Sequence, residues 1–223
     1  MGAYLAEAFE KFGEWQWYVI AAVLLLALFG AGMLVAGRKV KWTTHMLASA
    51  AMCIALSFVL GSIRLYRMPQ GGSITPGSML PVILFGMAYG VWPGIVAGAA
   101  WGLLDLMQSM SIVHPLQLLL DYPVAFAMMG LGALVRNQKK LGAMRLPVGV
   151  LIASIGRYVC AVVSGAVFFA EYAGDMNPWI YSLTYNLNYM WPDALIAMAL
   201  ALLLHATGLE SVIRGNSRKL RAG

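Results

Sequence analysis

Residues 171–193 read EYAGDMNPWIYSLTYNLNYMWPD and differ sharply from the strongly apolar sequence on either side of them. The stretch has no Lys, Arg or His, and it combines acids, amides and aromatic residues, namely Glu171, Asp175, Asp193, Asn177, Asn186, Asn188, Tyr172, Tyr181, Tyr185, Tyr189, Trp179 and Trp191. Aromatic faces attract cations, and carboxylates complement that charge. One interpretation is a pocket for a small aromatic or cationic molecule. The other is an aromatic belt at a membrane–water interface.

The composition around this stretch places the chain in a membrane. The 223 residues are 61% hydrophobic and 11% charged, with a mean hydropathy of +0.76, whereas soluble domains carry about 25% charged residues. Cys53 and Cys160 stand within apolar runs and are expected to be core residues rather than a disulfide or metal pair. The three histidines are far apart, so we expect neither a metal nor a cofactor.

Seven apolar segments predict transmembrane helices, because about 20 apolar residues span a bilayer. The predicted spans are 15–37, 43–66, 79–89 (a short one), 92–110, 114–135, 146–169 and one within 179–207. The predicted fold is therefore an all-α integral membrane protein. Its parts are an acidic N-terminus with a first helix and basic linker (1–42), a substrate-binding membrane domain (43–207) and a basic tail (208–223).

The basic clusters predict the orientation of the chain in the cell membrane, and they argue against nucleic acid as a partner. With residue 1 outside, the 38–41 cluster, the 136–145 loop and the tail are all cytoplasmic, as the positive-inside rule requires. Four acids then fall in the outer half of the membrane, namely Asp105, Asp121, Glu171 and Asp193. Intramembrane acids usually face a cavity, so they predict an outward-facing pocket that favours a cation.

Helical spacing groups the candidate ligand-binding residues. Gln117 and Asp121 share a helix face, and Tyr185, Tyr189 and Asp193 are likewise four residues apart. Asp121 could instead only cap a helix or pair with Arg157, which we expect to be an internal ion-pair partner. Asp105 could lie at the headgroup level, and Trp101 is expected to be a belt or packing residue.

Four stretches, in the same order, carry a family resemblance: RMPQGGSITPGSMLP (67–81), VHPLQLLLDYPVAFAMMGL (113–131), GRYVCAVVSGAVFFAEYA (156–173) and MNPWIYSLTYN (176–186). They resemble the thiamine-specific S component of energy-coupling factor transporters, the ThiT-like family. The resemblance covers residues 43–207 and implies a six-helix core, with the first helix as an addition. It implies a high-affinity thiamine-binding subunit that captures the vitamin outside. Delivery inward would require a transmembrane coupling subunit and two cytoplasmic ATPases. The sequence leaves open thiamine phosphates or a related pyrimidine as ligands.

The resemblance also implies roles for particular residues. Asp121 and Tyr122 match an acidic–aromatic pair beside thiamine, Tyr181 and Asn186 match hydrogen-bonding residues, and Phe169 matches a stacking aromatic residue. The sequence pattern adds further members to the substrate-binding set, namely Gln117, Glu171, Tyr185, Tyr189 and Asp193. Ala161 departs from the family, whose members often carry a ligand-contacting His there.

Two further segments receive predicted roles. The glycine-containing loop with Gln70, Gly71, Gly72 and Ser73 is expected to be a mobile lid over the pocket. Ala51 and Ala55 form a small-xxx-small pattern, for which packing within the bundle and docking on a partner are both open from the residues alone. The resemblance favours docking.

Other classes of function are less well supported. The chain lacks the GxxxxGK[ST] motif, so it is not itself expected to be an ATPase. It is not expected to be an enzyme, because Ser164 lacks a convincing partner base. A proton-coupled secondary transporter of a small cationic or pyrimidine-type molecule is the main alternative, since buried acids can relay protons.

Overall fold

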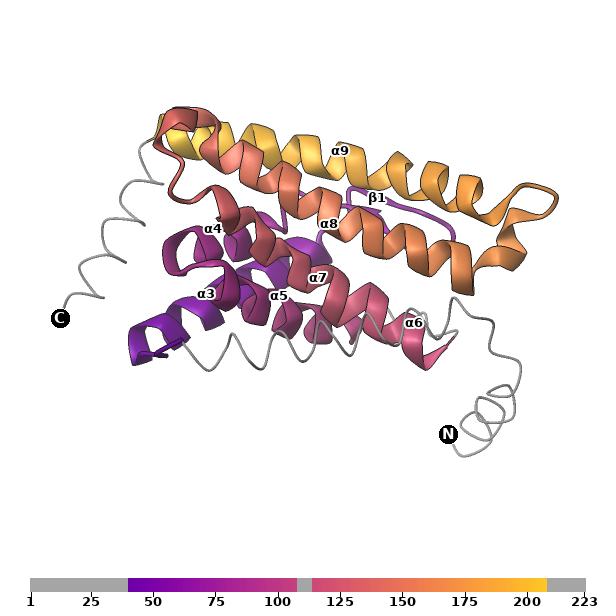
Figure 1. Cartoon of the computed structure of the whole chain (residues 1–223), viewed down its shortest axis with the longest axis horizontal. Coiled ribbons are helices and arrows are strands. Elements are labelled where there is room, and N and C mark those ends of the chain that lie inside the picture. Colours follow the sequence, from indigo (N-terminus) through magenta and orange to yellow (C-terminus); the bar gives the residue numbers. More distant parts are fainter. Residues whose placement is uncertain (1–39, 108–113, 208–223) are drawn as a thin grey trace.

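The computed structural model describes residues 40–107 and 114–207, which form a helical bundle with one small β-hairpin (Figure 1). The predicted span 15–37 and the tail 208–223 lie outside the described residues. The elements are α3 (Thr44–Ser62), β1 (Tyr66–Arg67), β2 (Ser73–Ile74), α4 (Leu80–Tyr89), α5 (Val91–Leu106), α6 (Pro115–Leu119), η2 (Leu120–Val124), α7 (Ala125–Ala127), η3 (Met128–Val135), η4 (Lys139–Met144), α8 (Arg145–Phe168), η5 (Ala170–Ala173) and α9 (Pro178–Ala206).

Within the described residues, four helical segments are long and apolar enough to cross a membrane. They are Thr44–Ser62, Leu116–Val135, Lys139–Phe168 and Pro178–Ala206, and they confirm the predicted multi-pass, all-α membrane fold. The short predicted span 79–89 is different. It forms α4, whose 10 residues rise about 15 Å, half of a hydrocarbon core about 30 Å thick. Helix α4 is therefore too short to cross alone, and it lies almost wholly buried within the bundle.

The segment from α6 to η3 is one helical path with an irregular turn in it. Pro123 lacks an N–H group, and its ring would clash with a carbonyl one turn earlier in a regular helix. Leu120–Val124 forms a wider π turn at this point. Such turns are frequent at functional sites, and this one carries Asp121 and Tyr122.

Glycines on α5 bring this irregular segment close. Gly94, Gly98 and Gly102 are four residues apart and share one helix face. A Cβ at Gly98 would collide with the Phe126 carbonyl oxygen, and one at Gly102 with the carbonyl of Tyr122. Small residues allow such backbone contact between membrane helices. The contact fixes the π turn against α5.

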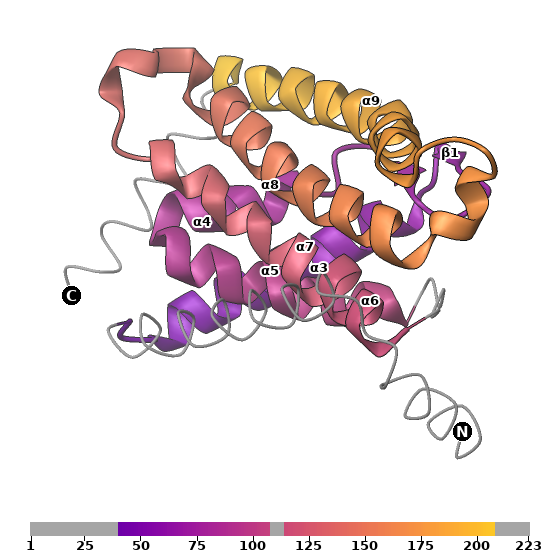
Figure 2. The same ribbon diagram turned by 45° about the vertical axis from the view of Figure 1, so that its right-hand side comes forward.

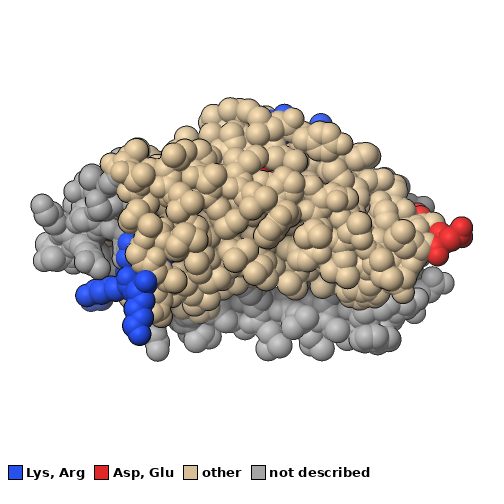
Figure 3. All heavy atoms as spheres, turned by 90° about the horizontal axis from the view of Figure 1, so that it is seen from above, with Lys and Arg blue, Asp and Glu red and all other residues tan. Residues whose placement is uncertain are grey.

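Helices α8 and α9 run side by side along the bundle (Figures 1 and 2). The Ser182 hydroxyl donates to the Val162 carbonyl at 2.8 Å, and the Tyr158 hydroxyl donates to the Leu183 carbonyl at 2.9 Å. Helix α9 has 29 residues and a length of about 43 Å, so it is longer than the hydrocarbon core is thick. One face of the molecule carries basic residues at one end, acidic ones at the other and few charges between (Figure 3), as a lipid-facing flank requires.

Candidate functional site

A cavity of about 170 Å³ lies where the end of α3, the 64–78 segment, α5, α6, η2 and the facing parts of α8 and α9 converge. A volume of this size exceeds what a single buried water needs. Most of the predicted site residues line it: Gln70, Gly71, Gly72, Ser73, Gln117, Asp121, Tyr122, Phe169, Tyr181, Tyr185, Asn186 and Tyr189. The chain thus brings together residues that are more than 100 positions apart in sequence.

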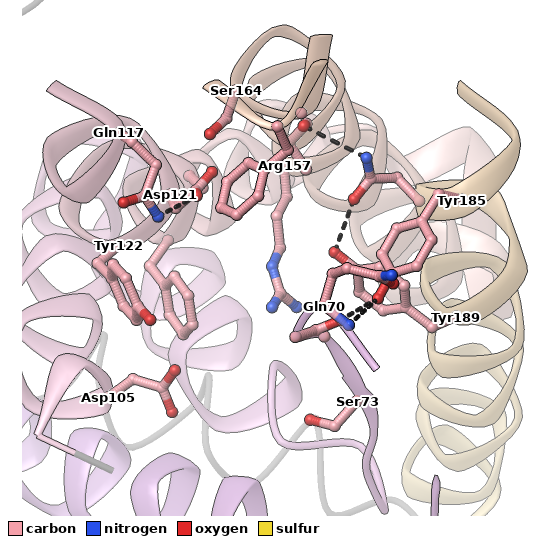
Figure 4. Close-up of a pocket in the computed structure, with 18 of the residues that line it drawn as sticks. Gln70, Ser73, Asp105, Gln117, Asp121, Tyr122, Arg157, Ser164, Tyr185 and Tyr189 are labelled. Atoms are coloured by element: carbon pink, nitrogen blue, oxygen red, sulfur yellow. Dashed lines mark hydrogen bonds between the residues drawn. The ribbon is translucent and has the colours of Figure 1, made fainter. Parts of the chain in front are cut away.

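Asp121 and Gln117 form the polar corner of the cavity (Figure 4). Gln117 is 1% exposed, and its Nε2 donates to Asp121 Oδ2 at 2.7 Å. The bond confirms the predicted shared helix face. His114 caps α6 instead, since its Nδ1 accepts from the Leu116 N–H at 3.1 Å. Partial burial lowers the pKa of His114, which favours the neutral ring that this acceptor role needs.

Three tyrosines of α9 form an aromatic wall along the cavity. The ring centroids of Tyr181 and Tyr185 are 5.8 Å apart, and those of Tyr185 and Tyr189 are 6.2 Å apart. The Tyr189 hydroxyl donates to Asn186 Oδ1 at 2.9 Å, while Asn186 Nδ2 donates to the Ser182 carbonyl at 2.9 Å. These bonds fix the Asn186 amide and the Tyr189 ring in one orientation.

The predicted lid is a hairpin that lies against this wall. Strands β1 and β2 pair Tyr66 with Ile74 and Arg67 with Ser73. Gly71 and Gly72 have φ of +96° and +86°, a conformation that glycine adopts without steric cost. The Tyr185 hydroxyl accepts from the Gln70 N–H and donates to the Gly71 carbonyl, both at 2.9 Å. The hairpin tip is thereby held over the cavity.

Two predicted ligand-binding residues do not line the cavity. Glu171 is exposed on η5. Asp193 is buried, and it accepts hydrogen bonds from the Thr75 N–H and the Thr75 hydroxyl, both at 2.8 Å. Thr75 lies at the foot of the lid, so Asp193 contacts the lid from behind the cavity wall.

Several lining residues were not in the predicted set, and Arg157 is the most central of them. Its guanidinium lies between the Asp121 corner and the tyrosine wall (Figure 4), 4.7 Å from the centre of the Phe126 ring. Arg157 is an internal ion-pair partner, as predicted, but its partner is Asp193 rather than Asp121: its Nη1 lies 3.9 Å from Asp193 Oδ2. An arginine inside a membrane span is itself a functional signal, although the sequence did not show that this one faces the cavity.

Trp101 also lines the cavity, and of its two predicted roles the structure confirms packing rather than a place in a membrane belt. It is 1% exposed and packs edge-on against Phe126 at 4.6 Å. Its indole N–H makes no hydrogen bond within the part of the chain that the structure describes. The four-residue spacing of glycines on α5 was the signal that this face is buried.

The charges around the cavity are mixed rather than purely acidic. Asp105 and Asp121 share its lining with Arg64, Arg67 and Arg157. A cationic ligand therefore has to lie near carboxylates while the arginines are neutralised or kept at a distance. No group of three or more His, Cys, Asp or Glu able to hold a metal occurs among the described residues.

Comparison with known proteins finds relatives of the chain among bacterial membrane transporters. The chain is 38% identical over 168 residues to the thiamine transporter ThiT of Bacillus subtilis (strain 168), an alignment that covers 70% of this chain and 86% of that protein. It is 34% identical over 122 residues to the thiamine transporter ThiT of Lacticaseibacillus paracasei, covering 48% of this chain and 61% of that one.

A solved structure of ThiT from Listeria monocytogenes has the same fold. It superposes with a TM-score of 0.59 at 22% identity and covers 74% of this chain and 93% of the other. Transport, not catalysis, is the activity by which these relatives are named. The family model described as "Thiamine transporter protein" matches residues 47–213. The chain therefore belongs to the thiamine transporter family.

Proposed function

We propose that this protein binds thiamine in the cavity and serves its uptake across the membrane. Thiamine is a flat molecule that joins an aminopyrimidine to a permanently cationic thiazolium. The observation that carries the proposal is the convergence of the Gln117–Asp121 corner and the tyrosine wall on one cavity. The carboxylate complements the cation, the aromatic faces attract it, and the Asn186 amide offers polar contact to the pyrimidine.

The proposed mechanism is that of an S component. The end of the bundle that holds the cavity faces outside, with the N-terminus outside and the C-terminus cytoplasmic. The hairpin closes over the captured vitamin. The sequence has no phosphate-binding loop of an ATPase, and in this mechanism a transmembrane coupling subunit and two ATPase subunits supply the energy for delivery. Thiamine phosphates or a related pyrimidine are the alternative ligands at the same site.

The proposed docking surface for the coupling subunit is the face of α3 that contains Ala51 and Ala55. Both alanines are exposed, and Met52, Leu56 and Val59 expose 73%, 52% and 56% of their surface beside them. The small residues leave a shallow, apolar strip that another helix can approach closely.

Replacing Ala51 with tryptophan should leave thiamine binding unchanged and abolish uptake by the assembled transporter. The side chain points away from the bundle, so the added bulk clashes only with a docked partner. Ala48→Trp, exposed one turn earlier on the same small-residue face, shows how far the strip extends along α3. Uptake of labelled thiamine into vesicles and binding to the isolated chain are measured side by side. Loss of binding in Ala51→Trp would place this face in the folding core instead.

Binding itself is tested by titrating the purified chain in detergent with thiamine while following tryptophan fluorescence. Trp101 lines the cavity, so a bound cation should quench it, and Trp101→Phe should remove most of that signal while saturable binding is retained by calorimetry. Saturation without nucleotide or partner supports an S component. Uptake by the chain alone in liposomes, abolished when the proton gradient is collapsed, would support the proton-coupled alternative, which the half-buried Asp121 and the buried Asp193 keep open.

A further inference from the structure

Asp193 uses its two carboxylate oxygens for two different partners. The carboxylate is 2% exposed and lies about 22 Å along α9 from its first residue. Oδ1 accepts both hydrogen bonds from Thr75, and Oδ2 faces the Arg157 guanidinium. Asp193 is not itself among the residues that line the cavity. The buried Asp193 side chain thus connects the lid to Arg157, the only arginine in the described part of α8 that lines the cavity.

The Thr75 contact serves the foot of the lid. Non-helical backbone at membrane depth is tolerated only where its polar groups are satisfied by protein or by water in a cavity. The Thr75 N–H meets that need on Asp193. Because the Thr75 hydroxyl donates to Asp193, the Ser78 hydroxyl at 2.8 Å must donate to Thr75. This chain of bonds needs an acceptor at position 193 but does not need its charge.

The Arg157 contact does need the charge. The guanidinium lies in the cavity, where it would repel a ligand cation at close range. Asp193 is the acid within ion-pair distance of it among the described residues. Asp105 and Asp121 also line the cavity and interact electrostatically with Arg157 at longer range, so an Arg157 without its own partner would compete with a cation for both carboxylates. Neutralising Arg157 from behind the wall leaves Asp121 available to the ligand.

We propose that Asp193 is a positioning residue that determines charge selectivity: it neutralises Arg157 so that the cavity accepts a cation, and it anchors the closed lid through Thr75. The inference rests on the proposed thiamine-binding function. It gives the two oxygens of Asp193 separate effects on ligand binding. The effect of Oδ2, through Arg157, depends on the charge of the ligand, and the effect of Oδ1, through Thr75, does not.

The test compares two variants and two ligands. The ligands are thiamine and a neutral analogue in which an uncharged aromatic ring replaces the thiazolium. Asp193→Asn keeps an acceptor for Thr75 but removes the charge, so it should weaken thiamine binding by about 100-fold and change binding of the neutral analogue by no more than about threefold. Thr75→Val keeps the charge but loses the hydroxyl, so it should weaken both ligands alike, by roughly tenfold. Equal losses for both ligands in Asp193→Asn, or no loss for either, would overturn the proposal.

A double variant covers the case in which Asp193→Asn fails to fold. Arg157→Gln combined with Asp193→Asn removes the isolated guanidinium and should restore both folding and thiamine binding to within about tenfold of the unmodified chain. A double variant that stays unfolded, or that binds no better than Asp193→Asn alone, would overturn the proposed coupling between the two residues.

A readout without ligand separates this inference from the proposed function. Trypsin can cleave after Arg64 or Arg67 when the lid detaches. Thr75→Val should be cleaved there about tenfold faster than the unmodified chain, and Asp193→Asn at nearly the unmodified rate. An unmodified chain that fails to bind thiamine refutes the proposed function, whereas unchanged cleavage in Thr75→Val refutes the lid anchor.

Discussion

Asparagine in place of Asp121 is expected to weaken thiamine binding by about 2–5 kcal/mol, the cost of removing one partner of a desolvated charge pair. That range corresponds to roughly 30-fold to several thousandfold in Kd. The asparagine oxygen can still accept from Gln117 Nε2, which now lies 2.7 Å from the carboxylate. The change therefore removes the negative charge while keeping the shape of the corner. Calorimetric titration of both proteins with thiamine gives the difference directly.

Asp105→Asn is the matched control for this prediction. Asp105 also lines the cavity, but it stands at the end of α5 beside Gly61, and its charge interacts with both Arg157 and Arg64. We expect a loss of about 1 kcal/mol or less there. If Asp105→Asn loses as much affinity as Asp121→Asn, the cation is held at the rim, and the assignment of Asp121 as its partner is refuted.

The second large effect is on folding. Valine at Gly98 is expected to destabilise the protein by at least about 3 kcal/mol, because the added Cβ would collide with the Phe126 carbonyl, a backbone atom that cannot rotate away. At this chain length the loss corresponds to a fall of about 6–12 °C in Tm. Fluorescence-monitored thermal unfolding in detergent, with size-exclusion chromatography, measures it.

Ala99→Val is the control, since it places the same β-branched residue one position further along α5 at a half-buried site. It should change the Tm by about 2 °C or less. Stability of Gly98→Val equal to that of the control would mean that α5 and the 122–130 segment can separate without cost. The glycine face would then not be what positions Asp121 and Tyr122.

Spacing along single helices was predicted well from the sequence. The four-residue intervals that join Gln117 to Asp121 and Tyr185 to Tyr189 need only the geometry of one helix, and the structure confirms that all four line one cavity. Asp193 continues the same interval, yet it lies behind the wall. Spacing tells which residues share a helix face but not which segment covers that face. Here Asp193 is covered by Thr75, which is more than 100 residues away in the sequence.

Other features depend on tertiary contacts that leave little trace in local sequence. Residues 79–89 are as apolar as a membrane span. Only the short length of this segment indicates a helix buried within the bundle rather than one that crosses the membrane. The inward position of Arg157 depends on Asp193 and Phe126, which belong to other helices. The π turn at Pro123 has no periodic pattern of its own, so the sequence predicted one regular span there.

That π turn also constrains how the gene can vary. A π turn holds one residue more than the α-helical path it replaces, so it behaves as a one-codon insertion kept within a helix. Deleting any one of residues 120–124 would remove that extra residue and restore the regular path. The segment after it would keep its register, because five residues of a π turn cover about the same rotation as four of an α-helix. Met129 and Ala133, now fully buried, would keep their partners, whereas Asp121 and Tyr122 would lose the wider turn that carries them. Single-codon deletions here should therefore preserve folding but weaken ligand binding, whereas substitutions at Val124 should leave both intact.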